Sequence, residues 1–218
     1  PERSFQLLDF LPLLHTALGE EMRRHFPADI LEASKQRYAL NFGRNTFLIA
    51  AVEPLLARFR DKGIGVIVLK GYALLRSVYP DIGERVMTDV DLLVRPQQAA
   101  VAVGLLKEAG FHPFNPAAGA VPGRVTPGLN ATLYERGGSM PFMIHVHWHL
   151  VNSSIPVLSY QPKIVMEELW QQAETLAGSE SGALMLTPHH FLIHLCEHAL
   201  NHHFQRLMLL YDIHRFIE

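Results

Sequence analysis

The chain has 218 residues, about half of them apolar, which is enough for one large or two small globular domains with a core that needs no cross-links. Nineteen Lys and Arg against 21 Asp and Glu give a net charge of −2, which excludes the basic field that non-specific nucleic-acid binding requires. The single Cys196 excludes an internal disulfide and is expected to be a buried thiol in a reducing cytoplasm.

No apolar run approaches the roughly 20 residues that a membrane span needs, and the start has no secretory signal. We therefore expect a soluble, cytoplasmic protein with no membrane span. The chain begins at Pro1, and its helical periodicity still continues at Glu218, so we expect a trimmed chain or a fragment of a longer one.

Helices are predicted before any strand. From Phe5 to Arg60 apolar residues recur at spacings of three and four, with breaks at Pro12 and Pro27, which indicates several amphipathic helices. Residues 1–60 are therefore expected to form a helical segment.

Strands and helices then alternate. Ile64 to Leu69 is a short run of β-branched and aliphatic residues between glycines, typical of a strand buried on both faces, and a helix is expected to begin directly after it. A second strand is predicted from Val86 to Val94. Pro96 and Gly110 are typical of the start and stop of the helix that follows.

Residues 115–128 are rich in Pro, Gly and Ala and predict a mobile loop. Two strands, 131–135 and 142–150, are expected to form a hairpin. Helical patterns dominate from Lys163 onward, with Thr187 and Pro188 as the N-cap and first residue of one helix. The predicted regions are 1–60, 61–150 and 151–218.

Two acids lie inside the second predicted strand, VMTDVDLLV. Side chains alternate along a strand, so Asp89 and Asp91 share one face while Val90 and Leu92 enter the core. Two like charges at this separation repel, and partial burial adds to the cost, so one carboxyl should have a raised pKa. A hard divalent cation such as Mg²⁺ removes that penalty, whereas a solvated strand end is the structural alternative.

The turn before these acids predicts a phosphate site. Gly71 lies where the first strand meets its helix, and free backbone N–H groups at a helix start favour a phosphate. Lys70 supplies a point charge, and Arg85 supplies a fork of donors, although either cation is equally compatible with a surface role.

These residues together resemble a known family. The segments LKG at 69–71 and TDVDLLV at 88–94, with Arg85 between them, are similar to the uncharacterised bacterial nucleotidyltransferase-like family of the DNA polymerase β superfold. The resemblance continues in FMIHVHWHL at 142–150 and in the closing helices, which contain Tyr211 and Asp212.

The resemblance implies an NTP held at the Gly turn and Mg²⁺, or Mn²⁺, held by Asp89 and Asp91. In the polymerase-β-like pattern a third carboxylate on a neighbouring strand completes the metal site, and here that position is His145. An imidazole accepts protons and binds softer ions but is a poor Mg²⁺ ligand. Glu135 is a candidate substitute, and loss of catalysis is the alternative.

The 13 histidines support a rival interpretation. His145, His147 and His149 alternate along one predicted strand and share a face, as metal ligands would. On the helix after Pro188, His194, Glu197 and His198 match the H-x-x-E-H spacing of a zinc peptidase, although packing of these rings is the stronger explanation.

The sequence thus predicts an α+β fold with a small mixed sheet, a nucleotidyltransferase-like core and flanking helices. The leading function is Mg²⁺-dependent transfer of a nucleoside monophosphate from an NTP to an unknown acceptor, which is a small molecule, a sugar or a protein. The alternatives are a catalytically silent relative that binds a nucleotide or a protein, and a His-ligated metal hydrolase.

Overall fold

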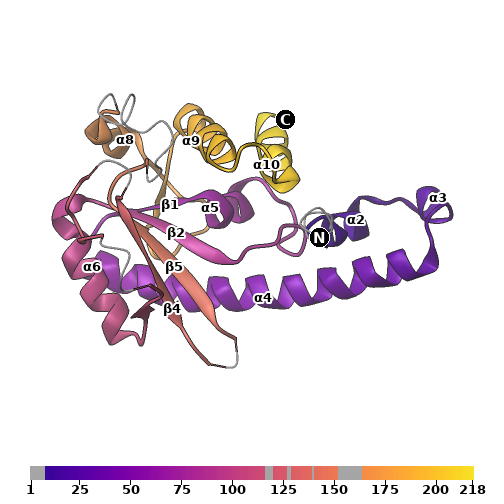
Figure 1. Ribbon diagram of the computed structural model, residues 1–218, viewed down its shortest axis with the longest axis horizontal. Helices are drawn as coiled ribbons and strands as arrows, with labels where there is room; N and C mark the ends of the chain where they lie inside the picture. The colour runs from indigo at the N-terminus through magenta and orange to yellow at the C-terminus, as the bar shows by residue number, and fades with distance from the viewer. Residues whose placement is uncertain (1–7, 116–119, 127–128, 139, 152–163) are drawn as a thin grey trace.

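The protein is organised around one seven-stranded mixed sheet with helices on both faces (Figure 1). The computed structural model describes residues 8–115, 120–126, 129–138, 140–151 and 164–218. The strand order is β3-β4-β5-β2-β1-β7-β6. The predicted α+β class with a mixed sheet is therefore confirmed.

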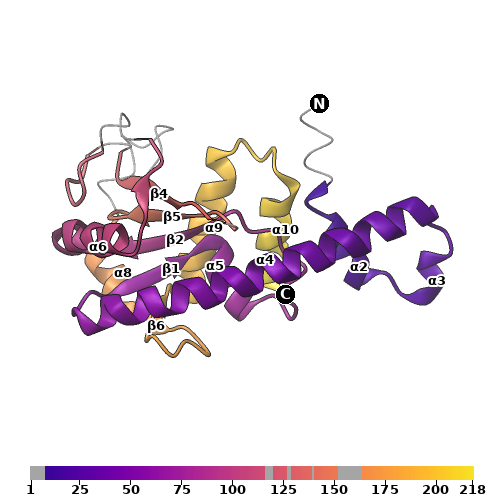
Figure 2. The same cartoon turned by 90° about the horizontal axis from the view of Figure 1, so that it is seen from below.

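The first region is helical, as predicted. It comprises α2 (Leu11–Ala17), α3 (Glu20–Arg23) and α4 (Ala28–Asp61). Pro27 precedes α4 as expected, but Pro12 lies in the first turn of α2, where proline is tolerated, and does not break a helix. Residues 1–7 of the predicted helical segment lie outside the described residues. Figure 2 shows α4 running along the molecule beneath the sheet and beyond it toward α2 and α3.

Four strands form the centre of the sheet: β1 (Val66–Leu69), β2 (Asp89–Val94), β4 (Ala131–Arg136) and β5 (Phe142–His147). β2 pairs antiparallel with β1 and parallel with β5, and β4 and β5 form the predicted hairpin. Every residue of β1 is buried, which explains its continuous apolar run. β2 begins three residues later than predicted.

Three short strands toward the two ends of the sheet were not predicted. They are β3 (His112–Pro113), β6 (Glu174–Thr175) and β7 (Leu184–Met185). Two residues are too few to show an alternating pattern. Because β7 pairs with β1, the C-terminal region contributes strands to the sheet as well as helices.

Within the described ranges five further helices cover the sheet: α5 (Lys70–Ser77), α6 (Pro96–Glu108), α8 (Met166–Gln172), α9 (Pro188–Asn201) and α10 (Leu207–Ile217). In Figures 1 and 2, α4 and α6 lie on one side of the sheet and α9 and α10 on the other. The core lies between these layers and contains fully buried Phe59, Tyr72 and Trp148.

Two expectations about single segments need comment. Cys196 is exposed on α9, so the prediction of a buried thiol is wrong; Leu195 and Ala199 are on the buried side of the helix, whereas Cys196 lies with exposed Ile193 and Leu200 on the other side. The predicted loop 115–128 is only partly described, because residues 116–119 and 127–128 lie outside the described residues. None of the described helices is long and apolar enough to cross a membrane.

Candidate functional site

The segment that leads into β2 is held in place by the long helix α4. Asn41 donates a hydrogen bond of 2.7 Å to the Gly83 carbonyl, and Asn45 donates one of 2.8 Å to the Arg85 carbonyl. Arg44 donates to the carbonyl of Met87 at 3.2 Å. These bonds satisfy carbonyls that no strand partner reaches and so fix the approach to Asp89.

Asp91 lies at the centre of a charged cluster on the sheet. In the strand register it is opposite Leu69 on β1 and His145 on β5. Its carboxylate is buried, and the Lys70 ammonium lies 2.6 Å from its Oδ1 atom. Lys70 has a left-handed backbone (φ 45°), a conformation that costs a non-glycine residue about 1–3 kcal/mol. This left-handed residue turns the chain from β1 into α5, and its side chain lies against Asp91.

The two aspartates have opposite pKa shifts. Burial alone would raise the pKa of Asp91, but the Lys70 ammonium and the hydrogen bonds from His145 and His147 outweigh it and hold that pKa well below its usual range. Burial, and then the negative charge of Asp91, raise the pKa of Asp89. The prediction that one of the pair has a raised pKa is therefore confirmed, and a cation beside both carboxylates would relieve their repulsion.

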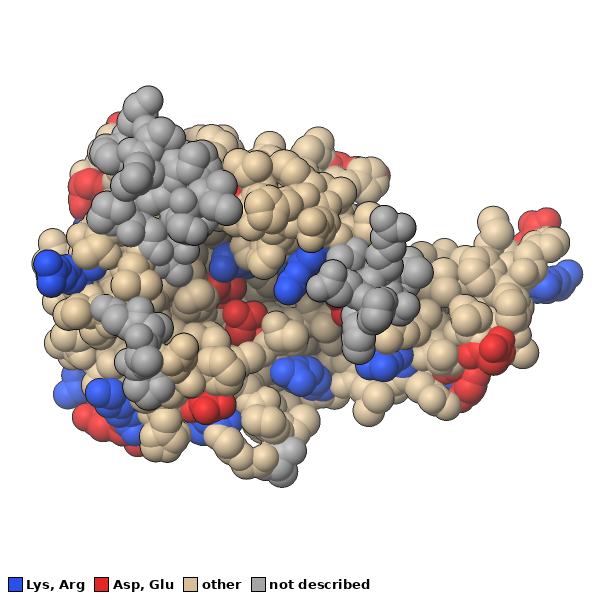
Figure 3. Space-filling view, in the orientation of Figure 1, with Lys and Arg blue, Asp and Glu red and all other residues tan. Residues whose placement is uncertain are grey.

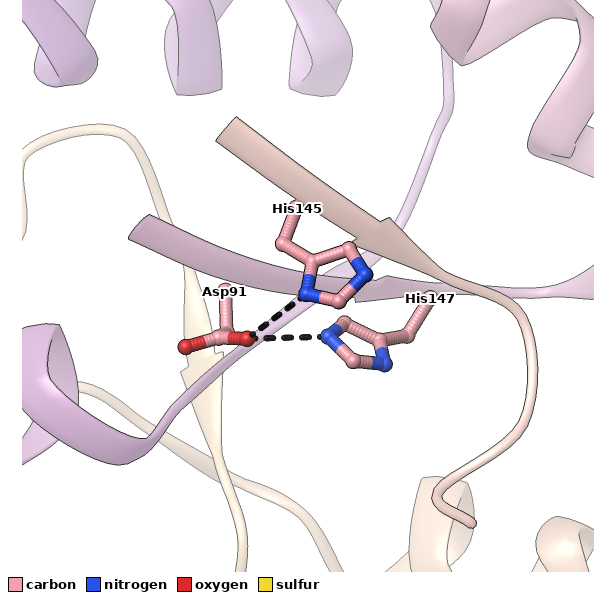
Figure 4. Close-up of side chains that lie close together, drawn as sticks. All are labelled: Asp91, His145 and His147. Atoms are coloured by element: carbon pink, nitrogen blue, oxygen red, sulfur yellow. Dashed lines mark hydrogen bonds and ion pairs between the residues drawn. The ribbon is translucent and has the colours of Figure 1, made fainter. Parts of the chain in front are cut away.

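Two imidazoles contact the same oxygen of Asp91. Figure 4 shows both rings directing a nitrogen toward the carboxylate. The Nε2 atom of His147 lies 2.9 Å from Asp91 Oδ1, and the Nδ1 atom of His145 lies 3.5 Å from it. Because Asp91 is ionised it accepts, so Nε2–H of His147 donates. The other nitrogen of His147, Nδ1, is buried and has no hydrogen-bond partner among the described residues.

Two other predicted partners lie outside this cluster. β5 ends at His147, and the Nδ1 atom of His149 accepts a hydrogen bond of 3.1 Å from the Val151 amide, so the expectation that three histidines act together is wrong for His149. Glu135 pairs with Met143 and is exposed. Among the described residues it belongs to no group of metal-ligating atoms, so it does not substitute for the third carboxylate.

A pocket of about 340 Å³ opens beside the cluster. The pocket is lined by all six residues that the sequence predicted for the nucleotide and metal site, which are Lys70, Gly71, Arg85, Asp89, Asp91 and His145. Asp9, His198, His202 and Arg206 line it as well. These four come from distant segments, so no local pattern placed them here, and His198 was predicted only for the rival zinc site. Figure 3 shows acidic side chains in a hollow of this face, with basic side chains beside them.

Arg85 is bound to the C-terminal helix α10. Its Nε and Nη2 atoms donate to the two oxygens of Asp212 at 2.8 and 2.7 Å, and the Tyr79 hydroxyl donates to Asp212 at 2.8 Å. Arg85 and Asp212 are both buried. The fork of Arg85 is thus directed at a carboxylate, and its contribution to a ligand in the pocket is mainly its positive charge.

Gly71 makes room for this guanidinium. A Cβ atom at residue 71 would lie 2.5 Å from Nη1 of Arg85. The absence of a side chain therefore lets Arg85 lie over the start of α5, where Lys70 and Gly71 border the pocket.

We expect Gly71→Ala to destabilise the protein by about 1–3 kcal/mol, because the added methyl group forces the buried Arg85 to move. Urea unfolding measures this change. Gly104→Ala is the matched control: Gly104 also lies in a helix, but a Cβ atom there meets nothing within 4 Å. That substitution should be neutral or stabilising by up to about 1 kcal/mol. Equal effects at the two glycines would contradict the steric explanation.

The histidines of α9 divide between two surroundings. His194 is buried, and burial lowers its pKa to about 3, whereas His198 and His202 border the charged pocket. His194, Glu197 and His198 do not form a group of metal-ligating atoms among the described residues. The H-x-x-E-H match is therefore not supported as a zinc-peptidase site.

The donor atoms around Asp91 fit a divalent cation. Asp91, His145 and His147 each offer a ligand atom, and these atoms lie within 4.8 Å of one another, in the only such group found among the described residues. Asp89 adds a second carboxylate on the same face of β2. Two carboxylates suit Mg²⁺, and the two imidazoles suit softer ions.

Comparison with known families agrees with this geometry. Residues 8–218 match the family described as "Uncharacterised nucleotidyltransferase". The chain belongs to this family. The match covers nearly the whole chain, including helices α9 and α10, which border the pocket.

Among solved structures, this nucleotidyltransferase family member is similar to an antigenic nucleotidyltransferase-like protein from Paracoccidioides brasiliensis. The sequence identity is 16% and the TM-score 0.44, with 77% of this chain and 74% of that chain covered. A search of curated proteins found no significant match.

Proposed function

We propose that this protein transfers a nucleoside monophosphate from a Mg²⁺-bound NTP to a hydroxyl acceptor. The observation that carries the proposal is the pocket in which Asp89 and Asp91 meet the start of α5, within a chain of a nucleotidyltransferase family. Carboxylates on one side and cations on the other suit a metal-bound triphosphate.

In this proposal each side of the pocket has its own task. Asp89 and Asp91 hold the divalent cation, which neutralises charge that develops on the α-phosphate. Lys70 and the free N–H groups at the start of α5, beside Gly71, bind phosphate oxygens. Arg85 supports them through its charge. The acceptor oxygen forms a bond to the α-phosphorus, the bond to the bridging oxygen breaks, and pyrophosphate leaves.

His145 has two chemical roles open to it in this site. As a free ring it takes the proton of the acceptor hydroxyl, and as a ligand it binds a borderline metal ion. The roles exclude each other, because a metal on Nδ1, the atom that faces Asp91, leaves the proton on Nε2. The acceptor is a small molecule, a sugar or a protein hydroxyl.

The presence of His145 where the family pattern has an acid also favours a second candidate, a silent relative that binds NTP without transfer. Calorimetric titration with Mg²⁺-NTP, together with pyrophosphate release in the presence of hydroxyl acceptors, separates the two. Release supports the enzyme, binding without release supports the silent relative, and absence of both would refute each.

We expect Asp89→Asn to weaken binding of Mg²⁺-NTP by at least about tenfold, since the loss of one charged ligand is equivalent to more than ~1.4 kcal/mol. Calorimetry measures it directly. Asp61→Asn is the control, because Asp61 is an exposed acid at the end of α4 that is not among the residues of the pocket. Unchanged affinity in Asp89→Asn would remove Asp89 from the site.

A further inference from the structure

The cluster around Asp91 contains more nitrogen donors than its charge requires. The Lys70 ammonium, 2.6 Å from Oδ1, already neutralises the buried carboxylate. The imidazoles of His145 and His147 approach this same oxygen from the next strand, at 3.5 and 2.9 Å. Neutralising Asp91 therefore does not explain why two rings converge on it.

Burial of His147 is also energetically unfavourable in its present state. Its side chain is 3% exposed, and its Nδ1 atom has no hydrogen-bond partner in the part of the chain that the structure describes. A buried polar atom without a partner costs about 1–3 kcal/mol. A metal ion on Nε2 would leave the ring proton on Nδ1, so this cost would persist. What favours a metal ion is that Nε2 of His147 and Nδ1 of His145 converge on one carboxylate oxygen.

We propose that Asp91, His145 and His147 form a site for a divalent transition-metal ion of the Mn²⁺, Co²⁺ and Zn²⁺ class, bound in preference to Mg²⁺ and without nucleotide. Two imidazoles and one carboxylate are a donor set typical of such ions, and three protein ligands leave positions open for water or a substrate oxygen. The inference rests on the proposed function for its catalytic meaning.

This assignment settles the role of His145. The ring is a metal ligand through Nδ1, and the proton of an acceptor hydroxyl passes to solvent water rather than to Nε2. The Mg²⁺ ion that comes with the NTP would then be a second ion, held by Asp89 and by the other oxygen of Asp91, because the contacts of Lys70, His145 and His147 are all to Oδ1.

Lys70 competes with the metal in this scheme. Its ammonium shares Oδ1 of Asp91 and has a side-chain exposure of 15%, so it has to turn away when the ion binds. We therefore expect Lys70→Met to tighten binding of the transition ion by about tenfold or more, because a competing cation near the site is removed.

The test is titration of the purified protein with Co²⁺, Zn²⁺ and Mg²⁺ in the absence of nucleotide. Calorimetry gives stoichiometry and affinity, and the visible absorption of Co²⁺ reports imidazole ligation. We expect one ion per chain, with Co²⁺ and Zn²⁺ at least about 100-fold tighter than Mg²⁺.

His145→Asp is the decisive variant, because it replaces a partly exposed imidazole with a hard oxygen ligand. It should weaken Co²⁺ binding by about tenfold and strengthen Mg²⁺ binding by about tenfold. It should also change the absorption spectrum of bound Co²⁺. His147→Ala should abolish the Co²⁺ site. His198→Ala is the matched control for the other histidines of the pocket and should leave the ion in place.

Three results would overturn the proposal: Mg²⁺ binding as tight as Co²⁺ binding, a Co²⁺ spectrum unchanged in His145→Asp, or loss of the ion in His198→Ala with retention in His147→Ala. The last would place the ion at α9. Since no nucleotide is present, these results are independent of pyrophosphate release. A protein that binds Co²⁺ as expected but releases no pyrophosphate would refute the transferase and leave the metal site standing.

Discussion

Asp91→Asn is expected to lower nucleotidyl transfer by about 10²–10³-fold, the size of effect seen when one charge-stabilising group is removed from an active site. Asp91 is the residue on which Lys70, His145 and His147 all converge. The amide keeps the shape of the carboxylate but loses its charge, so every one of these contacts weakens. Pyrophosphate release at saturating NTP measures the change.

The control for Asp91→Asn is Asp61→Asn, which removes the same charge from an exposed position. Circular dichroism and thermal unfolding of both variants establish that the fold persists. If Asp91→Asn keeps more than about a tenth of the wild-type rate while Asp61→Asn is unchanged, then Asp91 has no central part in catalysis.

Asp212→Ala is expected to destabilise the protein by about 3–5 kcal/mol, because it leaves the buried guanidinium of Arg85 without its partner. The same change also removes the acceptor of the Tyr79 hydroxyl. Urea unfolding measures the free energy, and the midpoint should fall accordingly. The expected loss is large because both partners are almost fully shielded from water.

Glu108→Ala is the matched control, since it breaks an Arg–Glu pair of similar length, 2.8 Å, on the surface. Exposed pairs contribute at most about 1 kcal/mol. A double variant, Arg85→Met with Asp212→Leu, should be less destabilised than Asp212→Ala, because no lone charge stays buried. Equal destabilisation by Asp212→Ala and Glu108→Ala would contradict this explanation.

The sequence predicted the central elements well because they have strong local patterns. Each of these patterns lies within a few neighbouring residues: the continuous apolar run of β1, the alternation in β2, and the Pro and Gly at the two ends of α6. The two-residue strands β3, β6 and β7 could not be predicted, because strands this short are defined only by pairing with their neighbours.

The residues at the site were predictable in kind, but their partners were not. The alternation along β5 correctly indicated that His145 and His147 share a face, yet it extended the pattern to His149, which lies beyond the end of the strand. Arg85 looked like a phosphate ligand, because the sequence could not show that Asp212, 127 residues later, takes two of its donors.

By itself the sequence determined the α+β class, the paired acids on one face of a strand and the turn at Gly71, since all of these follow from side-chain period and backbone preference. Only the tertiary structure decided which charges meet. Lys70, His145 and His147 reach one oxygen of Asp91 through strand register, and α9 and α10 complete the pocket from far along the chain. Contacts of that kind depend on packing between distant segments, and no local pattern encodes them.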